Sequence, residues 1–121
     1  MPTRRFLVVL AVTLAVALPA LCGGRGFRTQ HLLEEHYQRH GRDFGDVTQE
    51  KYLHLAQQLR DAHPGKSVLE VKRPDGSGAR FDRKTGAYVS YDPDGTIRTF
   101  FRPKDGERFF ELKARNATLP Q

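Results

Sequence analysis

The first candidates for chemistry are two histidines four residues apart, His36 and His40. On a helix they would lie one turn apart on the same face. Two adjacent imidazoles that titrate near neutrality can share acid and base work. The same spacing can hold a metal, but no Glu follows His36 as in the zinc-protease pattern, and no third ligand is evident. Two half-buried helix histidines that meet carbonyl groups or water are the structural alternative, which the residues alone favour.

The segment 96–102 is a second candidate, because its residues can be read as an alternating strand. One face would carry Ile97, Thr99 and Phe101, and the other Arg98, Phe100 and Arg102. Two arginines that flank an aromatic ring suit the stacking of a base and the binding of phosphates. An ordinary strand with one core face and solvated arginines is the alternative. Thr99 is unusual on a core face, because a buried hydroxyl needs a partner, and it therefore marks a candidate site.

A third group is basic and brackets one expected hairpin: Lys72, Arg73, Arg80, Arg83 and Lys84. It could be the electrostatic footprint of a nucleic acid or a solvated hairpin surface. The sequence has no phosphate-binding glycine loop, no dinucleotide-binding fingerprint and no nucleophile elbow. The available side chains suit cleavage of a phosphodiester by the neighbouring 2′-hydroxyl, without cofactor or metal. In that reaction one group removes the hydroxyl proton, another protonates the leaving oxygen, and a cation stabilises the phosphorane.

The helices and strands that would position these residues are bounded by clear capping and turn signals. A helix is expected from Gln30 to His40, with Thr29 as its N-cap and Gly41 as a left-handed C-cap. A second helix begins after Thr48 and stops at residues 63–65. Five strand-like runs separated by turn signals follow, at 67–73, 79–82, 87–91, 96–102 and 107–113. Their connections are too short for crossover helices, so the strands should be antiparallel neighbours. The predicted fold class is α+β, with two N-terminal helices packed on one face of a four- to five-stranded antiparallel meander.

Residues 1–22 have the features of an export signal. Arg4 and Arg5 precede an apolar run over 6–21, and Ala20 and Cys22 are small residues at the spacing that signal peptidase accepts. A membrane anchor is the first alternative, but the run is shorter than the roughly 20 apolar residues of a span. A lipoprotein tethered through Cys22 is the second, and the bulky residue before the cysteine argues against it. We expect a secreted or periplasmic protein without stable membrane insertion.

The expected mature chain is small and basic. Loss of residues 1–22 removes two arginines and no acidic residue, which lowers the net charge from +6 to +4. We expect a flexible lead-in at 23–28, a single domain at 29–113 and a flexible tail at 114–121. With no cysteine left, packing alone would hold this domain together, and we expect a monomer. Its charge suggests an anionic partner, such as a nucleic acid.

Four segments resemble a known family. The runs 36–45 (HYQRHGRDFG) and 48–56 (TQEKYLHLA) resemble the opening helices of certain bacterial toxin domains, and 94–103 (DGTIRTFFRP) and Phe81-Asp82 ahead of Thr85-Gly86 resemble the same domains. These domains form the C-termini of polymorphic and contact-dependent toxins and belong to the barnase/EndoU/colicin/RelE-like ribonuclease superfamily. The resemblance covers about residues 31–110. It implies a helical part over an antiparallel sheet and metal-independent cleavage of RNA, often tRNA.

The resemblance also implies roles for single residues. It makes His36, His40 and Thr99 catalytic, with Arg80 or Arg98 binding the phosphate. It implies an RNA substrate and an acidic immunity or inhibitor protein as partners. The further contacts that we expect with RNA come from basic and aromatic side chains: Lys72, Arg73, Arg98, Phe100 and Arg102. Such toxin domains are usually parts of large proteins, whereas this short chain is expected to carry its own export signal.

Three hypotheses about function follow. The first is a secreted, metal-independent endoribonuclease of the bacterial toxin type that uses no cofactor. The second is a non-catalytic envelope or extracellular module that binds an anionic polymer through the same basic surface. The third is a metal protein built on the histidine pair, for which the sequence offers the least support.

Overall fold

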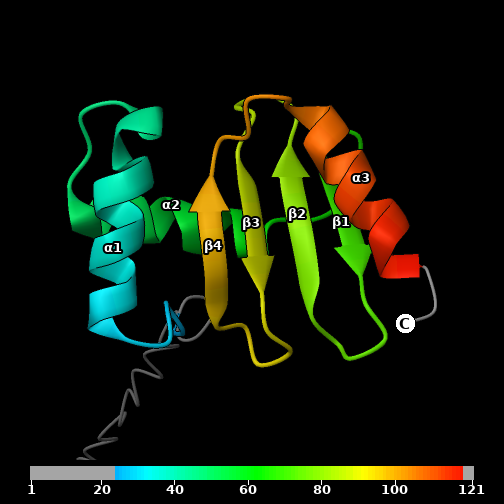
Figure 1. The fold of residues 1–121 in the computed structure, drawn as a ribbon, viewed down its shortest axis with the longest axis horizontal. Coiled ribbons are helices and arrows are strands. Elements are labelled where there is room, and N and C mark those ends of the chain that lie inside the picture. Colours follow the sequence, from blue (N-terminus) through cyan, green and yellow to red (C-terminus); the bar gives the residue numbers. More distant parts are fainter. Residues whose placement is uncertain (1–23, 119–121) are drawn as a thin grey trace, which may run out of the picture.

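A computed structural model describes residues 24–118 of the chain (Figure 1). The elements in chain order are α1 (Gln30–His40), the 3₁₀ helix η1 (Gly41–Phe44), α2 (Gln49–Asp61), β1 (Val68–Lys72), β2 (Gly78–Asp82), β3 (Tyr88–Tyr91), β4 (Ile97–Phe101) and α3 (Glu107–Thr118). The predicted export signal, with Cys22, lies outside the described residues, as does the end of the predicted tail. Among the described residues, no helix is both long enough and apolar enough to cross a membrane.

The first two helices begin where the sequence predicts. Thr29 and Thr48 lie in extended backbone, and their hydroxyl oxygens accept hydrogen bonds from the N–H groups of Leu32 (3.1 Å) and Lys51 (3.0 Å). A side-chain oxygen at this position satisfies a backbone donor that the first helical turn leaves free. Both predicted N-caps are therefore confirmed.

Gly41 does not form the predicted left-handed cap. Its φ is −56°, the chain continues directly into η1, and the positive φ falls at Gly45, where it is +87°. Glycine is needed at position 41 for space, because a Cβ there would lie 2.7 Å from the Tyr37 ring. The Tyr37 hydroxyl donates to the carbonyl of Val47 at 2.6 Å. The glycine thus allows Tyr37 to brace the connection between α1 and α2.

The four strands form one antiparallel sheet in the order β1-β2-β3-β4, which confirms the predicted meander. The fifth strand predicted at 107–113 is wrong, because this segment belongs to α3. Phe109, Phe110 and Ala114 pack against the sheet from one side of that helix. Part of the predicted flexible tail, from residue 114 to Thr118, is the last turn of the same helix.

The helices cover both faces of the sheet (Figure 1). α2 lies behind β2, β3 and β4, where Tyr52, Val89 and Phe100 are almost fully buried. α3 lies in front of β1 and β2, on a second cluster that includes Phe81 and Phe110. α1 lies beside the edge strand β4 and runs in the same direction. The α+β class is therefore correct, but the predicted placement of all helices in the N-terminal part is not.

The segment before α1, which belongs to the predicted flexible lead-in, makes contacts with the sheet. The carbonyl of Gly26 accepts a hydrogen bond from the N–H of Ile97 at 2.9 Å, and Phe27 forms a parallel bridge with Ile97. This pairing extends the edge at β4 by one bridge. It also brings Phe27 next to α1.

A buried arginine holds that segment in place. Arg60, near the end of α2, is 7% exposed and donates to the carbonyls of Arg25 and Gly95. Its guanidinium also binds the carboxylate of Asp61 at 2.9 and 3.0 Å, which compensates its charge. One side chain thus connects the N-terminal segment, α2 and the β3–β4 turn.

Candidate functional site

A β-bulge interrupts the alternation predicted for β4. Tyr91 pairs with Ile97, whereas the preceding Ser90 pairs with Thr99, so Arg98 is an extra residue in the ladder. An extra residue shifts every later side chain to the other face of the sheet. The face assignment predicted from the sequence therefore fails beyond Arg98.

The bulge buries an aromatic residue that was predicted to contact RNA. Phe100 joins Ile97 in the core on the α2 side and is 1% exposed. Its ring stacks on Phe44 with centroids 4.4 Å apart. Thr99 and Phe101 point to the opposite face, toward the α3 side. The prediction that Phe100 stacks a base is wrong, because the core encloses its ring.

The two histidines lie where α1 meets β4. Their ring centroids are 6.1 Å apart, and both side chains are half-buried. His36 packs on Phe27, at 4.8 Å between centroids, and His40 packs on Phe101 at the end of β4, at 5.2 Å. We call His36, His40, Thr99 and Phe101 the α1–β4 seam. The structure thus brings the predicted histidine pair to the strand that carries Thr99.

Thr99 lies in the middle of β4 and is half-buried. It shares a face with Phe101 and stands opposite Ser90 of β3, which is 6% exposed. Within residues 24–118 its hydroxyl makes no hydrogen bond to another side chain or to the backbone. This hydroxyl therefore keeps its hydrogen-bonding capacity free of the described chain.

Both imidazoles have pKa values below the ordinary 6.5. For His36 the main cause is burial, followed by the positive charges of His40 and Arg39, while Glu35 acts in the opposite direction. Burial is also the main cause of the lowered pKa of His40, which Asp43 raises and Arg39 lowers. At neutral pH the neutral form of each ring is therefore favoured more than in an exposed histidine.

The surroundings of the two rings differ. Nδ1 of His36 is buried and has no hydrogen-bond partner within the described chain, which adds to the cost of charging this ring. Nδ1 of His40 lies 3.8 Å from the carboxylate of Asp43. A nearby carboxylate stabilises a protonated imidazole, so His40 is the ring better suited to carry a proton.

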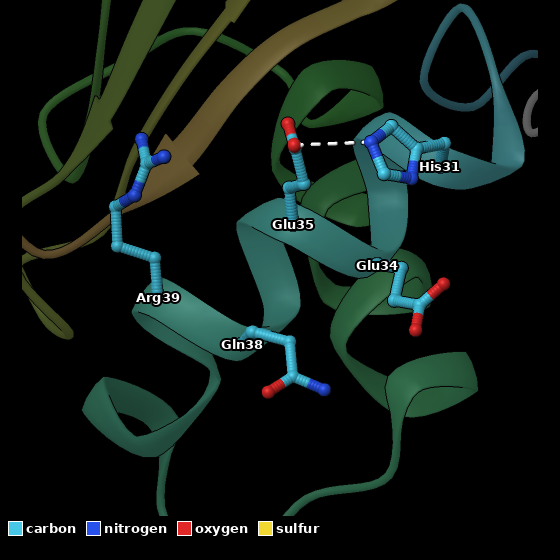
Figure 2. A pocket seen from close by; sticks show the side chains of 5 residues that line it. All are labelled: His31, Glu34, Glu35, Gln38 and Arg39. Carbon is cyan, nitrogen blue, oxygen red and sulfur yellow. Dashed lines mark ion pairs between the residues drawn. The ribbon is translucent and has the colours of Figure 1, made fainter.

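The sequence reasoning missed Arg39, whose charge lowers the pKa of both seam histidines. Arg39 is exposed in the last turn of α1, three residues after His36 and next to His40. In Figure 2 the carboxylate of Glu35 is paired with His31, at 3.1 Å, and not with Arg39. Arg39 has no ion pair among the described residues. Its spacing from His36 was a usable signal, because residues three apart are neighbours on a helix.

A shallow hollow on the outer side of α1 also includes Arg39. Figure 2 shows its side chains, which all come from this helix: His31, Glu34, Glu35, Gln38 and Arg39. Within residues 24–118 no group of three or more His, Cys, Asp or Glu side chains is arranged to hold a metal ion. The structure gives the hollow no further feature that indicates a ligand.

Both arginines that were predicted to bind phosphate form ion pairs with carboxylates of the chain. Arg80 donates two hydrogen bonds to Glu70, at 2.9 and 2.7 Å, across the β1–β2 pair. Its register places it on the α2 side of the sheet, opposite to the face that carries Thr99. Arg98 is bound by Asp92. Arg80 is therefore not brought to the seam, and the charge of Arg98 is already compensated.

The remaining predicted RNA contacts divide between the two ends of the sheet. Lys72 and Arg73 lie where β1 turns into β2, at the lower end in Figure 1. Arg102 follows β4 at the upper end, where α1 also finishes. Lys84, in the β2–β3 turn, lies at this upper end too. Only the upper group is at the end of the molecule where His40 meets Phe101.

No protein-family model matches the chain, and no curated protein does. Among solved structures, it is similar to a ribonuclease from Escherichia coli in complex with its inhibitor protein. The two are 18% identical, the match covers 65% of this chain and 95% of that chain, and the TM-score is 0.46. Similarity at this level assigns no residue and no activity.

Proposed function

We propose that the chain is an exported, metal-independent endoribonuclease of the bacterial toxin type, which cleaves RNA through attack by the 2′-hydroxyl. The observation that carries the proposal is the pair of half-buried histidines on α1, which lies beside the strand of Thr99 and bears the free charge of Arg39. This reaction needs two groups that titrate near neutrality, together with a hydroxyl and a cation. The resemblance of residues 36–56 and 94–103 to toxin ribonuclease domains supports the same choice of residues.

The two histidines take different parts in the proposed reaction. A neutral imidazole removes the proton of the 2′-hydroxyl while the 2′-oxygen forms a bond to phosphorus, and His36 suits this role because burial and neighbouring positive charge keep it neutral. The bond from phosphorus to the 5′-oxygen then breaks, and a protonated imidazole gives that oxygen a proton. His40 suits this second role because Asp43 favours its protonated form. The products are a 2′,3′-cyclic phosphate and a 5′-hydroxyl.

The phosphorane formed between these steps carries negative charge that the seam has to stabilise. Arg39 is the cation assigned to this task, since carboxylates already bind Arg80 and Arg98. The hydroxyl of Thr99 is assigned to donate a hydrogen bond to a phosphate oxygen. Donors fixed in place before the reaction stabilise such a charge more effectively than water does.

The proposal includes export and an inhibitor. Removal of residues 1–22 would release a basic enzyme to the periplasm or the medium, and an acidic inhibitor protein would complement its charge in a producing cell. The alternative is a lipoprotein held through Cys22. Mass spectrometry of the exported protein distinguishes them, because the first ends its leader at Cys22 and the second retains Cys22 with a lipid attached.

Digestion of total RNA and of tRNA in the presence of EDTA tests the activity. We expect the chain without residues 1–22 to produce fragments with 2′,3′-cyclic phosphate ends. His36→Ala and His40→Ala should each lower the rate about a hundredfold or more, and His54→Ala, at an exposed position of α2, serves as the matched control. Absence of cleavage by the unmutated protein would overturn the proposal. Salt-sensitive RNA binding without turnover would then favour the non-catalytic binding module.

A further inference from the structure

Three loops meet at the end of the sheet where β4 finishes. Arg102, the first residue after β4, donates to the carbonyl of Asp43 in η1 at 3.1 Å. On its other side, its Nε lies 3.7 Å from the position that a Cβ would take on Gly86 of the β2–β3 turn. The loop that leads to α3 begins directly after Arg102. The side chain of Arg102 therefore lies between η1 and the β2–β3 turn, at the start of the third loop.

Four cations on these loops are exposed and form no ion pair within the described chain, whereas Arg83 of the β2–β3 turn is paired with Glu107. Arg42 belongs to η1, Lys84 to the β2–β3 turn and Lys104 to the loop before α3. With Arg102 they form what we call the loop-end surface. None of the four forms an ion pair within residues 24–118. Their positive charge is therefore available to a partner.

Most carboxylates on the same loops already have partners. Glu107 binds the arginine of the β2–β3 turn at 2.6 Å, and Asp82 accepts the backbone N–H of Lys84 at 2.9 Å. The carboxylate of Asp43 faces a seam histidine at 3.8 Å. A backbone N–H does not neutralise the charge of Asp82, and neither Asp46 nor Asp105 forms an ion pair within residues 24–118. The four cations of the loop-end surface thus outnumber these three uncompensated carboxylates.

At the opposite end of the sheet, three arginines are paired with carboxylates. Arg25 lies 3.5 Å from Asp94, and Arg28 lies 3.9 Å from Asp92, which also binds Arg98. Most of the arginines at this end are therefore already in ion pairs. Lys72 and Arg73, at the same end, have no carboxylate partner within the described chain, so this end has two such cations where the loop end has four.

We propose that the loop-end surface binds the phosphate backbone of single-stranded RNA on one side of the cleaved bond. The inference rests on the proposed function, and Asp43 provides the physical link between the two sites. Its carbonyl accepts the hydrogen bond from Arg102, and its carboxylate lies 3.8 Å from Nδ1 of His40. A strand whose scissile phosphate lies at the seam therefore has its next phosphates within reach of Arg102.

The chemistry of the four side chains fits this ligand. A guanidinium can bind a phosphate through two parallel hydrogen bonds, and an ammonium binds it as a point charge. Positive charge spread over three loops suits a flexible single strand, whose backbone can follow an irregular surface. The inference moves the binding surface away from Lys72 and Arg73, which lie at the other end of the sheet.

Binding of a 2′-O-methyl oligoribonucleotide with a fluorescent label tests the inference. This probe lacks the nucleophilic hydroxyl, so it reports binding with both seam histidines intact. The loop-end variant is Arg42→Gln/Lys84→Gln/Lys104→Gln. The matched control, Arg28→Gln/Lys72→Gln/Arg73→Gln, removes the same charge from the opposite end. Thermal unfolding of both variants shows whether each is folded.

We expect the loop-end variant to reduce the slope of log K against log salt by about two, because each lost phosphate contact on a single strand removes about 0.7. The control variant should keep the slope of the unmutated chain. An equal reduction in both variants, or no binding of the probe by the unmutated chain, would overturn the inference.

Cleavage assays separate this result from the proposed function. If the protein binds the probe through the loop-end surface but does not cleave RNA, the binding surface is supported and the ribonuclease proposal is wrong. If the protein cleaves RNA and the loop-end variant binds the probe as the unmutated chain does, the ribonuclease proposal is supported and the binding surface is wrong.

Discussion

The lowered pKa values of His36 and His40 determine the pH at which the proposed reaction runs best. The mechanism needs one neutral and one protonated ring, so the rate is highest between the two apparent pKa values of the pair. Because both values are lowered from 6.5, we expect a bell-shaped profile of kcat/KM whose maximum lies below pH 6.5. Initial rates on a short RNA substrate across the acidic and neutral range measure it. A maximum above neutrality would contradict the assigned surroundings of the two rings.

A second residue-scale prediction concerns the hydroxyl of Tyr52. It is buried and donates to the carbonyl of Phe100 in the core, and burial raises its pKa, so it remains a donor over the whole physiological range. Tyr52→Phe leaves that buried carbonyl without its partner, and we expect a loss of about 1–3 kcal/mol in the free energy of unfolding. Urea denaturation measures this loss.

Tyr37→Phe is the matched control for that variant. It also removes a tyrosine hydrogen bond to a backbone carbonyl, 2.6 Å to Val47, but at a partly exposed position where water can replace the donor. Its cost should be clearly smaller than that of Tyr52→Phe. Equal costs would mean that burial of the Phe100 carbonyl does not decide the stability.

At the scale of elements, the sequence predicted what adjacent residues determine. Thr29 and Thr48 cap their helices through donors three residues away, so the signal is contained in a few positions. The turns that produce the antiparallel order are also local. These features were predictable because no distant part of the chain is needed to form them.

The failed predictions depend on contacts between distant residues. The segment 107–113 has two adjacent phenylalanines, a pattern compatible with a strand or a helix, and it becomes helical where Phe109 and Phe110 meet the sheet face left free by α2. The bulge at Arg98 is visible only in the pairing with β3. That bulge decides which side chains of β4 face α1, so the sequence predicted the histidine pair on one face of a helix but not the aromatic residues beside it.

Arg60 gives a prediction at the same scale, since it connects three elements. Arg60→Met removes the donors to the carbonyls of Arg25 and Gly95, and we expect residues 24–28 to detach from β4 while the sheet stays folded. Hydrogen exchange of the Ile97 amide, which donates to the Gly26 carbonyl, should become faster. Gln58→Met, at an exposed position of the same helix, controls for the substitution. Unchanged exchange at Ile97 would show that the pairing with β4 alone holds the segment.

At the scale of the whole molecule, the two faces of the sheet differ in what they bury. The α2 side holds the enclosed core around Tyr52, Val89 and Phe100. The other side leaves β4 next to α1, because α3 contacts β1 and β2 instead. A half-buried histidine pair can therefore form at the edge of the sheet without opening the main core. Because burial lowers the pKa of both histidines, this arrangement makes the free energy of unfolding depend on pH.

We expect the free energy of unfolding to fall in two separate pH ranges. His36 and His40 have folded pKa values below 6.5, so when the pH falls through 6.5 the unfolded chain takes up protons that the folded chain does not, and stability decreases. Hydrogen bonds lower the pKa of three exposed carboxylates, Asp75, Asp94 and Glu107. Their contribution is complete above about pH 5, where these groups are ionised in the unfolded chain too, and is lost as the pH falls through their lowered pKa values.

Urea denaturation at a series of pH values separates the two ranges when the unmutated chain is compared with His36→Gln/His40→Gln. Glutamine keeps a polar side chain at each position but takes up no proton, so the variant should lose the upper decrease and retain the lower one. Between neutral pH and a pH below 6.5, the free energy of unfolding should therefore fall less in the variant than in the unmutated chain. An upper decrease that persists unchanged in the variant would contradict the placement of the two rings in a partly buried seam, because it would have to come from groups other than His36 and His40.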